Sequence, residues 1–204
     1  MIKTNTLMFS ASDLVKRSAM QICYMRKNKV VHKPTPMQLE GVKEQLEKSV
    51  TGYEEMRGKY SAPGHIIFYC FDEVDPDNNL LIEHKSVKGE APDWYFQQSV
   101  LQVGYYSSLQ LLNPDKKLST ASFFVAQGHE GKELDLKDKT MKSILQFGEE
   151  KYEISVLEPE KIVEFYNKKA QATKEYEASK DWDGQFKKQE FNQLNTYFSC
   201  QKLK

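Results

Sequence analysis

The sequence predicts a single domain of the α/β or α+β class. Its 204 residues suit one ordinary domain built around one hydrophobic core. No internal repeat and no Gly/Ser-rich or Pro-rich linker divides the chain. Segments with helical periodicity alternate with short segments rich in β-branched and aromatic residues. The expected order is helix, helix, strand, strand, helix, strand, a further candidate strand and a C-terminal helix.

The first half of the chain is expected to hold two helices and then two strands. Cap residues at 10–13 precede a helical pattern over 14–27, and residues 37–56 show a second one. After Pro63-Gly64, residues 65–74 are rich in β-branched and aromatic side chains and predict a strand. Turn residues at 76–79 separate this strand from a second one over 80–87.

The second half is expected to begin with a long buried helix over 93–112, which Asn113-Pro114 ends. Residues 120–127 predict a short strand, residues 128–150 are polar, and residues 151–159 are a further strand candidate. From Pro159 to the end the pattern is helical. We therefore expect a core over about 36–127 and a C-terminal helical extension over about 159–204.

The composition limits the classes of function. Lys and Arg number 29 and Asp and Glu number 29, which excludes a strongly basic protein held to nucleic acid by bulk charge but allows a local basic patch. Cys23, Cys70 and Cys200 lie far apart with no CxxC pair, which argues against a zinc ribbon or a disulfide framework. No apolar stretch has the length of a signal peptide or a membrane span, so a cytoplasmic setting is expected.

The predicted hairpin over 65–87 concentrates chemically useful side chains. If its strands are antiparallel around residues 77–78, Asp72 lies opposite Glu83, and Lys85 points to the same face as Glu83. His84 points to the other face, toward packing or solvent. Opposed carboxylates destabilise a hairpin, and a bound Mg²⁺ or Mn²⁺ would remove that repulsion. The prediction depends on the strand register.

An ordinary interpretation of the same residues is open. Asp72, Glu83 and Lys85 also fit a solvated sheet face on which Lys85 forms a salt bridge with a carboxylate, and their spacing alone does not decide. Asp75 and Asp77 could compete as metal ligands, but they are more simply explained as turn residues.

Asp72 followed by Glu83-His84-Lys85 resembles the Asp…(Asp/Glu)-x-Lys signature of the PD-(D/E)xK nuclease superfamily. Further motifs are similar to its RecB-like branch, which includes the nucleases of CRISPR spacer acquisition. These are a Ser-x-Ser-x-Leu start, a Cys followed by aromatic and basic residues, and a Gln-x-x-x-Tyr motif on the next helix, found here at Ser10–Leu14, Cys23–Arg26 and Gln102–Tyr106. The resemblance covers roughly residues 10–127.

The resemblance implies a restriction-endonuclease-like core, with a central mixed sheet flanked by helices. It also implies metal-dependent hydrolysis of DNA phosphodiester bonds by an exonuclease of recombination, repair or spacer processing, acting on linear or single-stranded DNA in a bacterial or phage setting. Asp72 and Glu83 would hold Mg²⁺ or Mn²⁺, and Lys85 would orient water and offset charge in the transition state. Gln102 would hydrogen-bond near the metal site or the DNA backbone, and Tyr106 would brace its helix or stack near the strand.

The chain also departs from the pattern of the branch. A metal-binding His commonly follows a Gly before the first strand, whereas here Gly41 is followed by no His. Glu44 or Glu47 could supply a carboxylate, or this ligand is missing. The missing His motivates an alternative, a catalytically inactive relative that serves as a DNA-binding or assembly protein. The cysteines do not complete the four that some members use for an iron–sulfur cluster, so no cluster is expected.

Substrate charge requires a positive surface, and residues 14–35 contain six basic residues and no Asp or Glu. This block fits DNA contact beside a phosphodiesterase site, or otherwise a solvated helix face. The basic residues expected to bind nucleic acid are Lys16, Arg17, Arg26 and Lys27.

The aromatic residues have two interpretations as well. Tyr24, Trp94, Tyr95 and Phe96 could stack on unpaired bases or fill the core, and we assign Trp94 to the core first. Core packing is an equal alternative for Tyr105 and Tyr106. A third function remains open, a protein–protein interaction domain that uses the charged C-terminal helix from Lys161 to Lys180.

Overall fold

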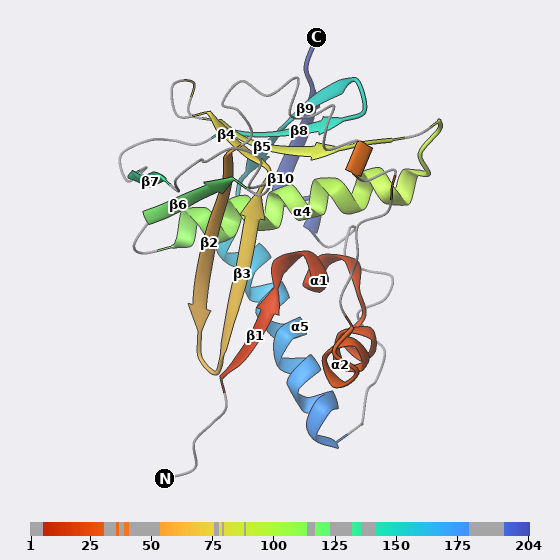
Figure 1. The fold of residues 1–204 in the computed structure, drawn as a ribbon, viewed down its shortest axis with the longest axis vertical. Coiled ribbons are helices and arrows are strands. Elements are labelled where there is room, and N and C mark those ends of the chain that lie inside the picture. The colour runs from red at the N-terminus through yellow and green to blue at the C-terminus, as the bar shows by residue number, and fades with distance from the viewer. Residues whose placement is uncertain are drawn as a thin grey trace.

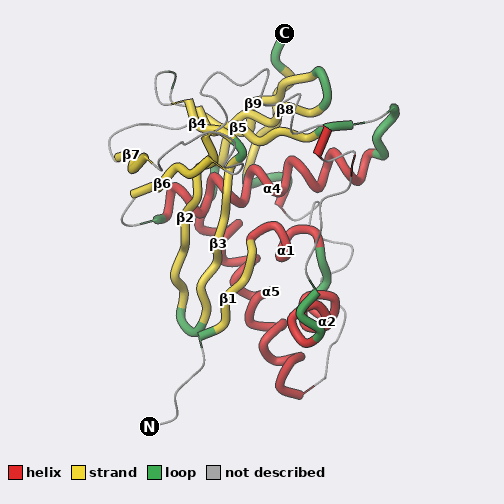
Figure 2. The backbone as a smooth tube through the Cα atoms, in the orientation of Figure 1, coloured by secondary structure: helices red, strands yellow, loops and turns green. Residues whose placement is uncertain are grey.

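The computed structural model describes residues 6–30, 36, 39–40, 54–75, 78, 80–87, 89–113, 117–122, 132–135, 142–179 and 194–204. Within these residues the fold is mixed α/β (Figure 1, Figure 2). The helices are α1 (Ala11–Lys16), α2 (Ala19–Lys27), α4 (Asp93–Leu112) and α5 (Pro159–Ser179). The strands are β1 (Leu7–Ser10), β2 (Glu54–Ala62), β3 (His65–Phe71), β4 (Glu73–Asp75), β5 (Leu80–Lys85), β6 (Lys117–Ser122), β7 (Lys132–Asp135), β8 (Lys142–Phe147), β9 (Glu150–Val156) and β10 (Phe198–Lys202).

The first sheet has the strand order β1-β3-β2-β6-β7. It is mixed, because β1 runs parallel to β3 whereas the other neighbours are antiparallel. A tight turn joins β2 to β3, and Gly64 supplies the positive φ of 78° that this turn needs. On β3, Tyr69 is buried opposite Gly58 of β2, where the missing side chain leaves room for the tyrosine ring.

The second sheet has the strand order β10-β9-β8-β5-β4. It is also mixed, with β5 parallel to β8 and the remaining neighbours antiparallel. The chain passes from the first sheet to the second at Asp72, a bend between β3 and β4. The single strand expected over 65–74 is therefore two strands that belong to different sheets.

Helix α4 forms the centre of the core. Its residues are buried without a break from Ser99 to Gln110, as expected for a helix that is covered on all sides. Figure 1 shows α4 crossing the middle of the molecule, with β8 and β9 on one side and α1 and α5 on the other. The ring of Tyr105 stacks on Tyr166 of α5 at 4.0 Å between centroids, so α5 is part of the core.

The helix expected over 14–27 is interrupted. Ser18 has an extended backbone and begins α2 as its N-cap, with its side chain accepting from the Gln21 N–H and its own N–H donating to the Gln21 side chain. This reciprocal pair is a capping box, which satisfies amide groups at a helix start and therefore favours a new helix at this point. Residues 11–16 form the separate short helix α1.

The mixed α/β class predicted from the sequence is confirmed, but the single central sheet is replaced by two. Strands β1, β2, β7 and β8 were not expected, and residues 54–56 belong to β2, not to the end of the helix predicted over 37–56. Within that predicted helix, residues 37–38 and 41–53 lie outside the described residues. The prediction of helix to the C-terminus is wrong at 198–202, which pair with β9 as β10.

None of the described helices combines the length and the apolar character that crossing a membrane requires.

Candidate active site

Asp72, at the bend between β3 and β4, is the first residue of the candidate site along the chain. Strands β4 and β5 pair in the expected antiparallel register, with Glu73 opposite Ile82 and Asp75 opposite Leu80. Continued by one residue, this register sets Asp72 across from Glu83. The Asp72 carboxylate meets β5 directly, because its Oδ2 accepts the His84 backbone N–H at 2.8 Å. The register on which the sequence prediction depended is confirmed for the paired residues.

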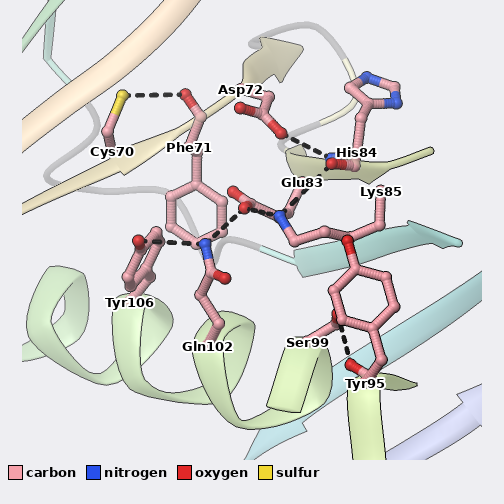
Figure 3. A network of polar contacts seen from close by, with 10 residues as sticks. All are labelled: Cys70, Phe71, Asp72, Glu83, His84, Lys85, Tyr95, Ser99, Gln102 and Tyr106. Atoms are coloured by element: carbon pink, nitrogen blue, oxygen red, sulfur yellow. Dashed lines mark hydrogen bonds and ion pairs between the residues drawn. The ribbon is translucent and has the colours of Figure 1, made fainter. Parts of the chain in front are cut away.

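Glu83 and Lys85 reach the same face of β5 because side chains alternate along a strand. Glu83 is only 2% exposed, and its Oε1 accepts a hydrogen bond from the Lys85 ammonium. The same ammonium lies 3.4 Å from the His84 carbonyl oxygen. Figure 3 shows Asp72, Glu83 and Lys85 converging above α4, so the structure brings the three expected residues together.

Helix α4 completes this group with two side chains that lie one helical turn apart. Gln102 is buried, and its Nε2 donates to Glu83 Oε1 at 2.6 Å and to the Tyr106 hydroxyl at 3.1 Å. Tyr106 is also buried and packs edge-on against Phe71 at 5.5 Å. Tyr106 therefore supports Gln102 from the core and offers no exposed ring to nucleic acid.

The electrostatics of the site follow from burial and from close charges. Desolvation raises the pKa of Glu83 to about 7, and the negative charge of Asp72 adds to this shift, while Lys85 opposes it. Desolvation alone would lower the pKa of Lys85, but the charges of Glu83 and Asp72 raise it above its ordinary value. Lys85 therefore stays protonated at neutral pH, whereas Glu83 changes its protonation state near pH 7.

Lys16, at the end of α1, belongs to the same electrostatic group. Although its side chain is exposed, the pKa of Lys16 is lowered, first by desolvation and next by the positive charge of Lys85. Glu83 and Asp72 act in the opposite direction on the pKa of Lys16. This expected DNA-binding residue thus interacts electrostatically with the carboxylates and the ammonium of the candidate site.

The other expected DNA-binding residues are engaged elsewhere or are simply exposed. Arg17 forms an ion pair of 2.8 Å with Asp13, one helical turn before it. Arg26 pairs with Glu177 of α5 at 2.9 Å and so joins α2 to α5. Lys27 is exposed at the end of α2. The basic block is therefore divided among several contacts, and Lys16 is a member that interacts electrostatically with the site residues.

Two buried oxygens of the site have no hydrogen-bond partner within the described part of the chain. They are Glu83 Oε2 and Gln102 Oε1. Buried polar atoms are almost always satisfied, so a pair of unsatisfied acceptors indicates a missing donor or cation. These oxygens are hard ligands, and Mg²⁺ typically takes one or two carboxylates together with water and substrate oxygens. The residues present therefore fit a divalent ion.

The described ligand set is small. Asp72 and Glu83 provide two carboxylates, and among the described residues no three or more His, Cys, Asp or Glu side chains lie together in a way that could hold a metal ion. Glu44, the expected further ligand, lies outside the described residues, as does Asp77. Asp75 accepts hydrogen bonds from the backbone and the side chain of Asn78, which is a turn role.

One polar pair beside the site was missed by the sequence analysis. His84 points away from the Glu83 face as expected, but its Nε2 lies 3.0 Å from Oε2 of Glu73. Glu73 is 1% exposed, so the pair is buried on the far side of β5. His84 thus fixes β5 from both sides, with its ring on Glu73 and its N–H on Asp72. The sequence offered one indication of this pair. Residues 72 and 73 are both acidic, and alternation along a strand sends neighbouring side chains to opposite faces, so one of the two could meet His84.

The aromatic residues predicted either to stack on bases or to fill the core differ in their exposure, and Trp94 differs from the expectation. Trp94, which we assigned to the core, is 62% exposed, so that assignment is wrong. Phe96 faces inward, with its ring 5.3 Å from Phe147 and 4.8 Å from Tyr152. The reason is helical geometry, because Trp94 and Phe96 are two residues apart and their side chains therefore point about 200° apart around the axis of α4, to nearly opposite sides. Tyr24 of α2 is exposed as well.

The cysteines lie in separate parts of the fold. Cys23 is buried, its thiol contacts the Thr173 carbonyl at 3.4 Å, and burial raises its pKa to about 11. Cys200 is exposed on β10. A raised pKa keeps the Cys23 thiol protonated and unreactive, in agreement with a packing role.

Comparisons of the chain with protein-family models, with curated proteins and with solved structures find no match. The geometry of Asp72, Glu83, Lys85 and Gln102 is therefore the basis for a functional conclusion.

Proposed function

We propose that the chain is a metal-dependent DNA nuclease that hydrolyses phosphodiester bonds at the group formed by Asp72, Glu83 and Lys85. The observation that carries this proposal is the convergence of two carboxylates and a buried ammonium beside unpartnered acceptor oxygens. A purely structural ion pair between Lys85 and Glu83 needs neither a second carboxylate nor unsatisfied acceptor oxygens. Burying such charged or unsatisfied groups lowers the free energy of unfolding.

Asp72 and Glu83 would hold Mg²⁺ or Mn²⁺, and Glu44 is a proposed further ligand. Such an ion, when bound, polarises a phosphoryl oxygen and lowers the pKa of water. Gln102 has a positioning role, because its amide holds Glu83 Oε1 and leaves Oε2 of that carboxylate available. Tyr106 in turn holds the Gln102 amide from the core side.

Lys85 would stabilise the negative charge that develops on the phosphate during hydrolysis. Its raised pKa keeps the ammonium charged at neutral pH, and the contact with Glu83 fixes its position before the substrate arrives. Lys16 adds a second positive charge that interacts with the same carboxylates, and it would attract the phosphate backbone. Linear or single-stranded DNA is the substrate proposed from the resemblance.

The test is hydrolysis of end-labelled linear and single-stranded DNA in EDTA, in Mg²⁺ and in Mn²⁺. We expect cleavage with either metal, none in EDTA, and a fall of about 100- to 1,000-fold in kcat for Lys85→Met. Asp72→Asn should remove the metal-dependent activity. Lys168→Met, which alters an exposed lysine of α5, is the matched control and should cleave as the wild type does.

Three outcomes would contradict the nuclease proposal. Cleavage that survives both Lys85→Met and Asp72→Asn would place the activity in a contaminant or at another site. Salt-sensitive DNA binding without cleavage would favour the inactive DNA-binding alternative. The absence of both binding and cleavage would favour a protein-interaction role.

A further inference from the structure

Trp94 is an exposed indole at the edge of the candidate site. It lies in the first turn of α4 and is 62% exposed, although tryptophan is highly buried on average in folded proteins. Its ring is not isolated, because it contacts the ring of Tyr95 edge-on, with the centroids 5.9 Å apart. The indole therefore contacts Tyr95 while most of the residue's surface is open to solvent.

Tyr95 lies between this indole and Lys85 of the candidate site. Its ring packs on Phe147 of β8 at 5.5 Å between centroids, and its carbonyl accepts a hydrogen bond from Ser99 at 2.9 Å. Figure 3 shows the Tyr95 hydroxyl directed toward the Lys85 side chain, with which it interacts electrostatically. Trp94 thus stands one aromatic ring away from Lys85, on a rigid support.

Charge identifies the chemistry that suits this surface. Lys85 lies on the other side of the Tyr95 ring from the exposed indole, and Lys16 interacts electrostatically with Lys85 and the two carboxylates. A phosphate held by these cations and a flat aromatic group stacked on the indole can therefore belong to one bound molecule. Nucleotides combine these two features, and aromatic side chains beside cationic grooves are the usual means of binding single strands. Bases inside a duplex are already covered on both faces by their neighbours, so only an unpaired or extruded base can stack on Trp94.

We propose that Trp94, supported by Tyr95, stacks on an unpaired base of the strand whose phosphate lies at Lys85, so that the site selects single-stranded nucleic acid. This inference rests on the proposed nuclease function; it adds a recognition residue and a physical reason for preferring single strands to duplex DNA.

Binding of a fluorescein-labelled oligo(dT) and of a blunt hairpin duplex tests the inference. Anisotropy is measured in EDTA and with Ca²⁺ in place of Mg²⁺. Trp94→Ala should weaken oligo(dT) binding roughly 5- to 150-fold, the range for loss of one stacked base, and should leave duplex binding unchanged. Trp94→Phe should retain most of the affinity, because a ring remains. Leu157→Ala is the control, since Leu157 is another exposed apolar residue, also 62% exposed.

A second readout observes the indole itself. The chain has two tryptophans, so Trp182→Phe leaves Trp94 as the sole indole emitter, and oligo(dT) should quench it. Unchanged oligo(dT) binding by Trp94→Ala, together with unquenched emission and intact wild-type cleavage, would overturn the stacking role alone. Failure of the wild type both to bind and to cleave nucleic acid would overturn the stacking role and the nuclease proposal together.

Discussion

The replacement Glu83→Gln should change how the free energy of unfolding depends on pH. Glu83 is buried, and its pKa in the folded chain is raised to about 7 from an ordinary value of 4.5. The folded state therefore binds this proton more tightly than the unfolded state does. The resulting stabilisation is fully present below about pH 4.5 and is lost as the pH rises through about 7.

The magnitude follows from the shift. A difference of about 2.5 pH units corresponds to about 3 kcal/mol, since one unit is worth about 1.4 kcal/mol. Solvent screening reduces this figure little, because the Glu83 side chain is 3% exposed. In Glu83→Gln the amide does not titrate, so this component of the pH dependence disappears.

The assay is urea unfolding of wild type and Glu83→Gln in EDTA at several pH values from 4.5 to 7.5. The stability of the wild type relative to the variant should fall by about 3 kcal/mol across this window. Glu164→Gln, at an exposed site on α5, is the control and should show no comparable fall. Millimolar Mg²⁺ or Mn²⁺ should restore stability near pH 7 to the wild type only, because the ion binds the ionised carboxylate.

Parallel stability curves for wild type and Glu83→Gln would refute the reasoning. They would mean that Glu83 titrates at an ordinary pH, and hence that it is neither desolvated nor placed beside Asp72. Equal stabilisation of both proteins by the divalent ion would remove Glu83 from the ligand set.

Three further predictions follow from named contacts. Gly58→Ala should destabilise the fold by about 1–3 kcal/mol in urea unfolding, because the new methyl group overlaps the buried Tyr69 ring, and unchanged stability would contradict this packing. Glu73→Ala should cost about 1–3 kcal/mol and weaken divalent-ion binding in calorimetry, because His84 loses its partner, whereas Glu73→Gln keeps an acceptor oxygen and should retain most of both. Ion binding that is as tight in Glu73→Ala as in the wild type would exclude this positioning role. Divalent-ion affinity of the wild type should fall about tenfold per pH unit below about pH 7, since binding displaces the Glu83 proton, and a flat profile would contradict that link.

Much of the candidate site was predictable because it depends on local rules. Alternation along one strand sends Glu83 and Lys85 to one face and His84 to the other, whatever surrounds the strand. Antiparallel pairing around a short turn fixes the register that brings Asp72 toward Glu83. The spacing of Gln102 and Tyr106 sets both on one side of α4.

The sheet arrangement could not be obtained in the same way. Strand β8 could not be recognised from the sequence because it lies within the polar residues 128–150. It forms a strand because β5 and β9 pair with it on both sides. Residues 198–202 form β10 by pairing with β9, although their sequence follows a helical pattern. Backbone pairing between distant segments can override local propensity, and a single sequence shows no partner for a strand.

By itself the sequence predicted the fold class and, for an assumed antiparallel hairpin, the face on which the two carboxylates and the lysine meet, because these depend on short-range periodicity. Only the tertiary structure decided that Asp72 marks the crossing between two sheets, that Lys16 interacts with the charges of the site whereas Arg26 is paired with Glu177, and that Trp94 is exposed next to the Tyr95 ring. The physical reason is that burial and charge pairing are set by what packs against a residue, and the packing partners come from remote parts of the chain.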